Sequence, residues 1–412
     1  MKVNPSLCVL CRGRGLCDLA YCPIIARARA FTRLSRVRLS NIIEGSTPPA
    51  VFVGRMGYPY VRAGPSTPPI LGDTSIFDYP EKWSSLRVED ILEYRWSLVT
   101  GYRVYNVKRV EDRFLEEVRL LVLSDKPVDV QAVFEKPPRP VITFNEHEPP
   151  QGPRAPLSSF RVIGNPSIPR PLEKAYYDTD LPAAEAVASL YETGIPVSHI
   201  QKAFSLGSFG LKGQRKLVPT RWSITAVDNM ICRHILREVK GYKPINEVMV
   251  FEHEIHDNLF IGVLYPAKWS YEWMEAWWPG STWNPVGLNV VVEGDYEDYL
   301  GRTTYPGIGG CYYASMLATL EYLKYVKRQA TAVLIREIYP GFNLPIGVWF
   351  VRESCREMFK KGPAMKADSL REVCDYLDRV TKLGCKKWFS SSRLLRRILS
   401  TRKIEEYFKR LE

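Results

Sequence analysis

The chain has 412 residues, 45% of them hydrophobic and 25% charged, a composition typical of folded proteins and a length sufficient for one to three structural units. No run approaches the roughly 18 apolar residues that a membrane span needs, and the Cys- and Arg-rich start lacks the apolar stretch of a signal peptide. We therefore expect a protein without a membrane partner that stays in the cytoplasm.

Positive charge is concentrated at the two ends of the chain. Residues 1–38 carry eight Lys and Arg against one acidic residue, and residues 379–412 carry eleven against three. Since the whole chain has a net charge of +12, the long middle is slightly acidic. Basic blocks attract polyanions such as DNA by releasing counterions, which predicts salt-dependent binding and association with the nucleoid. A solvated, solubilising surface is the alternative interpretation.

Four cysteines lie close together near the start, in the spacing Cys8-x2-Cys11-x5-Cys17-x4-Cys22. The first pair presents two thiolates from one tight turn, and glycines after it let the chain bend back to complete a tetrahedron. A closed shell of four thiolates leaves no open coordination position. The spacing therefore predicts one structural Zn²⁺ ion in a knuckle over residues 1–30. An iron–sulfur cluster, or four unrelated buried cysteines, are the alternatives.

The other cysteines have no ligand spacing, and a reducing cytoplasm argues against disulfides. We expect core or surface thiols at Cys232, Cys311, Cys355, Cys374 and Cys385.

Periodicity and breaker residues predict a mixed α/β (α+β) fold. We expect a mixed sheet flanked by helices over residues 31–378, interrupted by a Pro-rich segment near 137–171, and a basic helical tail over 379–412. Strands are predicted at about 50–53, 246–255, 259–265, 286–293, 330–336 and 346–352. Helices are predicted at about 88–98, 108–123, 182–193, 196–204, 222–239, 311–326, 353–361, 368–381 and 391–399.

A glycine- and base-rich loop precedes the predicted helix at 222–239 and is the best candidate for a DNA-binding site. Its candidate contacts are Lys212, Arg215, Lys216, Arg221 and Trp222. Loop amides and a helix N-terminus favour phosphate oxygens, and Trp222 offers a stacking face for an unpaired base. The alternative is a surface loop whose cations pair with the acidic middle of the chain.

The predicted strand at 246–255 ends in the most polar segment of the chain. Alternation along a strand would place Glu252, Glu254 and His256 on one face, where they could bind a divalent metal for phosphodiester hydrolysis. The alternative is a solvent-facing strand and turn.

Several dense segments together resemble the archaeal Nre family of DNA-repair proteins. They are residues 51–65 (VFVGRMGYPYVRAGP), 215–228 (RKLVPTRWSITAVD), 309–314 (GGCYYA) and 344–353 (LPIGVWFVRE), accompanied by the four-cysteine head. The resemblance spans most of the chain. It implies a role in DNA damage and docking onto the sliding clamp PCNA, but it implies no particular reaction.

The C-terminal residues can be compared with the clamp-binding pattern Gln-x-x-aliphatic-x-x-aromatic-aromatic. Ile404, Tyr407 and Phe408 match its three apolar positions, and Thr401 stands in place of the glutamine. On one helical turn the three apolar side chains would project together as a plug for a groove. An ordinary amphipathic helix packed on the core is the alternative.

Three hypotheses for function follow. The first is a DNA-repair factor that binds DNA and the PCNA clamp. The second is a DNA-processing enzyme, with catalytic candidates Glu252, Glu254 and His256 for a metal-dependent nuclease, or Lys212 or Lys216 for an abasic-site lyase that forms a Schiff base. The third is an RNA- or nucleotide-binding protein. No motif indicates a small-molecule substrate.

Overall fold

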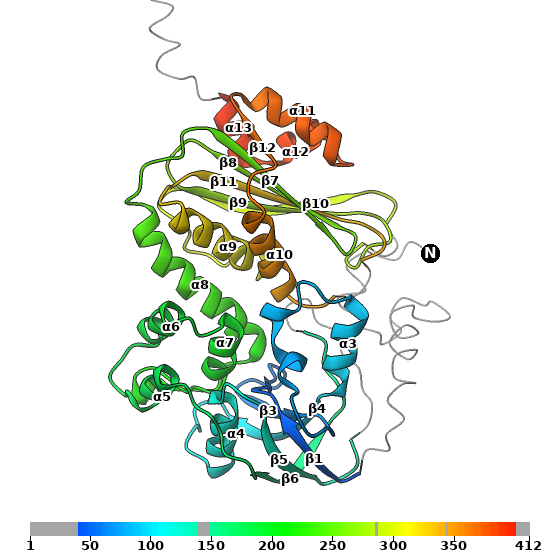
Figure 1. Ribbon diagram of the computed structural model, residues 1–412, viewed down its shortest axis with the longest axis vertical. Coiled ribbons are helices and arrows are strands. Elements are labelled where there is room, and N and C mark those ends of the chain that lie inside the picture. Colours follow the sequence, from blue (N-terminus) through cyan, green and yellow to red (C-terminus); the bar gives the residue numbers. More distant parts are fainter. Residues whose placement is uncertain (1–39, 139–148, 285–286, 343–344, 401–412) are drawn as a thin grey trace, which may run out of the picture. The chain divides into compact units, whose positions relative to one another are not determined.

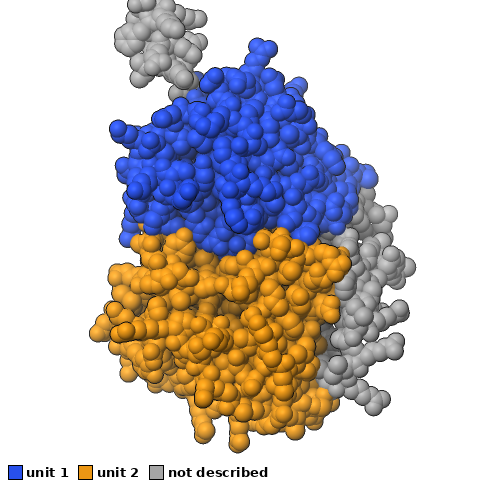
Figure 2. Space-filling view, viewed as in Figure 1, with its two compact units in different colours: residues 1–6, 235–343, 351–412 blue, residues 7–234, 344–350 orange. Residues whose placement is uncertain are grey.

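The computed structural model describes residues 40–138, 149–284, 287–342 and 345–400. The four cysteines of the predicted zinc knuckle and the predicted clamp peptide lie outside these residues. The chain divides into two compact units (Figure 2): an N-terminal unit of residues 7–234 with 344–350, and a C-terminal unit of residues 235–343 and 351–412 with 1–6. The range 31–378, expected to form the mixed α/β core, contains parts of both units.

The N-terminal unit is built on a six-stranded sheet with strand order β1-β5-β6-β4-β3-β2. All neighbouring strands are antiparallel except β4 and β6. The strands are β1 (Ile42–Thr47), β2 (Val51–Val53), β3 (Tyr60–Thr67), β4 (Val99–Asn106), β5 (Val128–Phe134) and β6 (Arg154–Val162).

Most of this sheet was not predicted, and β6 shows why. It runs through the Pro-rich segment at 137–171, which we expected to interrupt regular structure. Pro156 lies next to a register shift between β5 and β6, and a sheet accepts proline most readily at such an irregularity.

The helices of the N-terminal unit follow the predictions more closely. They are α3 (Val88–Ser97), α4 (Arg113–Leu123), α5 (Arg170–Tyr177), α6 (Ala183–Glu192), α7 (Val197–Ser205) and α8 (Thr220–Val239), with short 3-10 turns η1 (Ser75–Asp78), η2 (Pro80–Lys82) and η3 (Lys212–Gln214). Helix α4 is typical: Asp112 caps it by accepting from the amides of Phe114 and Leu115, and all of its apolar residues except Leu120 are buried.

The C-terminal unit contains the second six-stranded sheet, with order β10-β9-β11-β8-β7-β12. Its strands are β7 (Val248–Ile255), β8 (Asn258–Tyr265), β9 (Ser270–Trp277), β10 (Val291–Glu297), β11 (Thr331–Ile338) and β12 (Met365–Ala367). Strand β11 is central, parallel to β9 and antiparallel to β8. The two mixed sheets with their helices confirm the predicted α+β class.

Helices cover both faces of this second sheet (Figure 1). Helices α9 (Cys311–Tyr325) and α10 (Trp349–Lys360) lie on one face, and α11 (Leu370–Val380), α12 (Cys385–Ser391) and α13 (Arg393–Ser400) on the other. Successive side chains of β7 point to opposite faces of the sheet. Val250 packs toward the α11–α13 face, whereas Phe251 contacts Tyr322 of α9 and Phe359 of α10.

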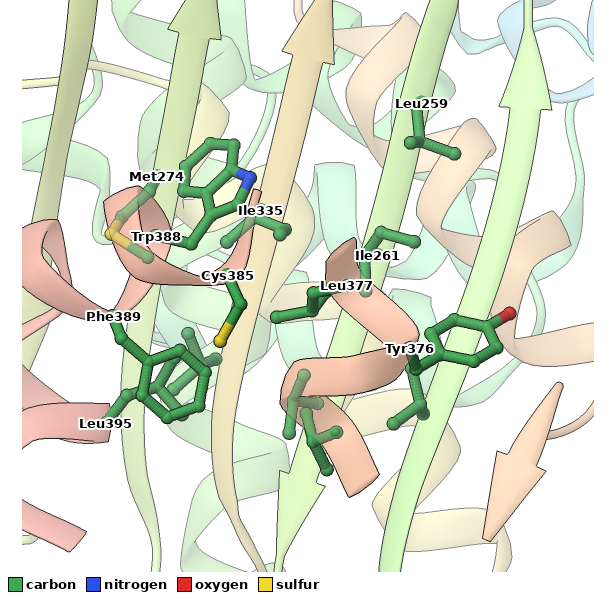
Figure 3. Close-up of a cluster of buried hydrophobic side chains, with 14 of the residues drawn as sticks. Leu259, Ile261, Met274, Ile335, Tyr376, Leu377, Cys385, Trp388, Phe389 and Leu395 are labelled. Atoms are coloured by element: carbon green, nitrogen blue, oxygen red, sulfur yellow. The ribbon is translucent and has the colours of Figure 1, made fainter. Parts of the chain in front are cut away.

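The core under α11–α13 is formed by strand and helix side chains that interlock (Figure 3). Ile261, Met274 and Ile335 come from the sheet, and Leu377 and Trp388 from the helices. Full burial of a side chain such as Leu377 contributes roughly 1.5–3 kcal/mol.

A disulfide joins Cys374 of α11 to Cys385 of α12, with 5.1 Å between the Cα atoms. The expectation that these two cysteines are thiols is therefore wrong. They carry no ligand spacing, and only the packing of α11 on α12 brings them together. Cys232 and Cys355 are buried thiols, as expected.

Two predicted strands differ in the structure. The run at 346–352 enters helix α10 instead of a strand, because a short apolar run looks the same in a buried strand and a buried helix. The strand predicted at 286–293 begins later, at Val291, and its partner β9 was missed.

Among the described residues, no helix is long and apolar enough to cross a membrane.

His199 on α7 is a buried structural histidine. Its Nε2 atom lies 2.6 Å from the carbonyl oxygen of Val122, and burial, aided by nearby Lys202, lowers the pKa of His199 to about 4. The folded protein therefore holds this ring neutral at pH values where the unfolded chain, with an ordinary pKa of 6.5, takes up a proton.

We expect the free energy of unfolding to fall as the pH drops from about 6.5 toward about 4, by on the order of 3 kcal/mol from His199 alone. His199→Gln should flatten this pH dependence, because glutamine does not titrate and can still donate to the Val122 carbonyl. Urea unfolding of both proteins at several pH values measures the effect. His253 has a similarly lowered pKa of about 4, so some dependence should remain. Identical pH profiles for the two proteins would contradict the assignment.

Candidate nucleic-acid interface

Three segments far apart in the sequence meet at one edge of the N-terminal unit. The amide of Val53, at the end of β2, donates to the Thr220 hydroxyl at the start of α8, over 2.9 Å. The amide of Leu217 donates to the carbonyl of Val107, whose own amide donates to the carbonyl of Pro59, each over 2.9 Å. The turn between β2 and β3, the end of β4 and the loop before α8 therefore form one continuous surface region.

Arg215 holds the loop before α8 in place. Its guanidinium donates to three backbone carbonyls: those of Gly210 and Tyr176, each over 2.8 Å, and that of Asp178 over 2.6 Å. Partial burial lowers the pKa of Arg215, although an arginine remains charged at any ordinary pH. In the structure these three hydrogen bonds fix the loop, and the DNA contact expected of Arg215 stays a prediction.

The ends of this loop are also tied to each other. The amide of Val218 donates to the carbonyl of Ser205 over 2.8 Å, and the Ser205 hydroxyl donates back to the Val218 carbonyl over 2.6 Å. Gly207 adopts φ +65°, and a Cβ atom there would lie 2.7 Å from the Lys216 carbonyl oxygen. The loop is thus an ordered platform that presents Lys212 and Lys216 to solvent.

Trp222, in the first turn of α8, forms an aromatic pair with Tyr58 from the turn between β2 and β3. The ring centroids are 5.2 Å apart and the planes are inclined by 57°. Both side chains remain open, with 45% of Trp222 and 47% of Tyr58 exposed. The neighbouring Arg221 is partly buried.

More apolar and aromatic side chains continue this surface along β3 and β4. Tyr60 and Arg62 face outward on β3, and Val104 lies opposite Arg62 on β4. The Arg62 guanidinium lies 5.0 Å from the ring centroid of Tyr102. We call the set Met56, Tyr58, Tyr60, Tyr102, Val104 and Trp222 the aromatic surface. Sequence reasoning found only Trp222 of this set, although the Tyr-Pro-Tyr run after Gly57 was a usable signal.

Acidic residues are absent from the segments that meet here. Residues 45–72, 94–110 and 193–227 contain no Asp or Glu. The same three segments carry eleven Lys and Arg: Arg55, Arg62, Arg95, Arg103, Lys108, Arg109, Lys202, Lys212, Arg215, Lys216 and Arg221. Arg95 and Lys202 are buried and pair with Asp78, but Lys108, Arg109, Lys212 and Lys216 are exposed. The region is therefore electropositive.

The acidic trio proposed for a nuclease is not assembled. Glu252 accepts a hydrogen bond from the Tyr376 hydroxyl, and burial together with this carboxylate raises the pKa of Tyr376. Glu254 is exposed, and His256 leaves the strand because it lies in the β7–β8 turn with φ +47°. Within the described ranges no group of three or more His, Cys, Asp or Glu could hold a metal ion. The strand alternation that we extended to His256 stops one residue before it.

The lyase candidates, Lys212 and Lys216, are both exposed. A lysine that forms a Schiff base is usually activated by an apolar pocket or an adjacent cation. The surroundings of Lys212 and Lys216 therefore favour charge contacts with a ligand over covalent chemistry.

Two family models match the chain, one for the N-terminal part of archaeal Nre proteins over residues 16–284 and one for the C-terminal part over residues 297–407. The chain belongs to the archaeal Nre family. The segments 51–65 and 215–228 that carried the resemblance are the ones that meet at the Tyr58–Trp222 pair.

Individual Nre proteins are similar over most of their length. The DNA repair protein NreB of Archaeoglobus fulgidus is 47% identical over 95% of this chain and 97% of its own. NreA proteins of Archaeoglobus fulgidus and Haloferax volcanii, both also named DNA repair proteins, are 37% and 35% identical over 86% and 81% of this chain, and over 89% and 83% of their own. No solved structure matches the chain.

Proposed function

We propose that this Nre protein is a DNA-repair factor that binds DNA through the electropositive region of its N-terminal unit and docks onto the PCNA clamp through its C-terminal peptide. The observation that carries DNA binding is the meeting of three acid-free segments on one surface, with exposed lysines around an open aromatic pair. The relatives named as DNA repair proteins support the cellular role.

DNA binding of this kind is dominated by phosphate contacts. Each lysine that neutralises a phosphate releases condensed counterions, so affinity falls as salt rises. Lys108, Lys212 and Lys216 are exposed cations of the region. Lys212 helps to hold the loop through its backbone amide, which donates to the Thr179 carbonyl over 3.0 Å, whereas Arg215 holds it through its side chain. The three lysines therefore test binding without disturbing the platform.

We expect the triple variant Lys108→Gln, Lys212→Gln, Lys216→Gln to bind DNA more weakly and with a flatter salt dependence, by roughly one slope unit for each lost phosphate contact. Fluorescence anisotropy with a labelled oligonucleotide over a salt series measures both quantities. A matched control replaces Lys126, Lys136 and Lys174, which are equally exposed on the same unit but lie outside the acid-free segments. If both triple variants lose the same affinity, binding follows net charge alone and the proposed surface is wrong.

The clamp proposal rests on the four C-terminal positions Thr401, Ile404, Tyr407 and Phe408 and on the family resemblance. Helix α13 ends at Ser400, so the peptide follows directly after a helix whose Leu394 and Leu395 are buried in the C-terminal unit.

Phe408→Ala should weaken clamp binding by roughly 30-fold, since an aromatic anchor contributes about 2 kcal/mol or more. Thr401→Gln should tighten it by restoring an amide donor and acceptor. Calorimetric titration with purified clamp measures affinity, and a thermal melt of each variant tests the alternative of a core-packed helix. If the Phe408→Ala protein is destabilised but binds the clamp normally, the C-terminal peptide is a helix packed on the core and the clamp proposal is wrong.

The zinc knuckle is proposed from its donor set alone. Cys8, Cys11, Cys17 and Cys22 would supply four thiolates, which suit Zn²⁺ in a closed structural site. Such an ion would contribute folding energy to residues 1–30 and no chemistry.

Elemental analysis of the intact protein should find one zinc per chain, and Cys11→Ser should abolish it. Because the described units have their own cores, the variant should keep its main thermal transition while residues 1–30 become more sensitive to proteolysis. Iron in place of zinc, or metal-free protein with an intact head, would overturn the assignment.

A further inference from the structure

We infer that the aromatic surface stacks the bases of single-stranded DNA, so that this protein prefers unpaired strands to duplex. The inference deepens the proposed DNA binding and rests on it. Phosphate contacts alone make no distinction between paired and unpaired bases. A set of exposed aromatic rings within the same electropositive region would distinguish them, because only unpaired bases can stack on the rings.

The first argument is the exposure of the rings. Tyr60 is 60% exposed and Met56 is 81% exposed, beside the half-open pair of Tyr58 and Trp222. Large apolar side chains gathered on one surface usually mark a binding site, because folding gains little from leaving them in water. The Tyr58–Trp222 contact covers part of each ring and leaves nearly half of each side chain for a ligand.

The second argument is that the rings are held on a rigid support. Trp222 projects from a helix whose start is fixed to β2 through Thr220. Tyr58 lies in a tight turn closed by the Tyr60 amide donating to the Gly57 carbonyl, with Gly57 at φ +88°. Rings that are already ordered lose little entropy when a base stacks on them, so they bind more tightly than rings on a mobile loop.

The third argument identifies the occupant. An apolar protein partner would have to cover cations from three segments that contain no acidic residue to offset them. A nucleic acid strand supplies both complements, since its phosphates suit the lysines and its bases suit the rings. In a duplex the base faces are hidden in the stack, whereas an unpaired strand can lay each base on an aromatic side chain. Single-stranded DNA is therefore the occupant that fits both features.

The sharpest test compares three probes of equal length: an oligothymidine, a strand of abasic sugar-phosphate units, and a duplex. The abasic strand carries the same phosphates without any base to stack. Trp222→Ala and Tyr58→Ala should each weaken oligothymidine binding roughly ten-fold or more and leave abasic-strand binding unchanged. Trp222→Phe, which keeps a stacking face, should retain most of the affinity.

Tyr325→Ala is the matched control, because Tyr325 is 84% exposed at the end of α9 in the other unit. It should bind all probes like the parent, and thermal melts should show that every variant is folded. The parent itself should bind oligothymidine more tightly than the abasic strand or the duplex.

Equal losses on the abasic strand and on oligothymidine would show that the rings only shape the backbone site, and would overturn stacking while leaving DNA binding intact. Unchanged binding by both ring variants would also overturn it. If the parent protein binds none of the three probes, the proposed function itself fails, and the base-stacking inference fails with it.

Discussion

The candidate interface depends on one partly buried cation, Arg215. A loop of irregular backbone cannot pair its own carbonyls, and a buried carbonyl without a partner costs roughly 1–3 kcal/mol. Arg215 satisfies the carbonyls of Gly210, Tyr176 and Asp178 at once, because a guanidinium presents several donors in a fixed fork. It thereby ties the loop to the end of α5. This attachment and the hydrogen bond from Val53 to Thr220 together hold the start of α8, which carries Trp222.

In the C-terminal unit, buried carboxylates on the strands accept hydrogen bonds from backbone amides and thereby hold the segments around α12 and α13. Glu272 on β9 accepts from the Ser392 hydroxyl and from the amides of Arg393 and Leu394, which open α13. Burial raises the pKa of Glu272, and these donors oppose the rise. Glu337 on β11 likewise accepts from the amides of Lys382 and Leu383 and from the Trp388 indole. Charged side chains from the strands thus fasten α12 and α13, the helices that lead to the C-terminal peptide.

The sequence predicted features that depend on neighbouring residues and missed those that depend on contacts between distant parts of the chain. Helices such as α4 and α11 were predicted because their apolar periodicity is local, and the class and family were predicted too. The strands β3 and β6 were missed because Gly64, Pro65 and Pro156 mask their alternation, and only pairing with distant strands defines them. The loop before α8 was identified as a site, but no local pattern shows whether an arginine faces a phosphate or a carbonyl. The Tyr-Pro-Tyr run that begins at Tyr58 was a usable signal for an exposed aromatic turn, but the proximity of Tyr58 to Trp222 exists only in the fold.

The segment 51–65 contains two kinds of residue that burial separates. Gly64 has no room for a side chain, since a Cβ atom there would lie 1.9 Å from the Gly101 carbonyl oxygen, and the side chains of Val53 and Ala63 are buried. These residues are explained by the close approach of β3 to β4. Met56, Tyr58 and Tyr60 are exposed on the same short stretch and bury little on folding. Packing accounts for the first group alone. The exposure of the second group beside exposed cations is the observation on which the proposed stacking of bases rests.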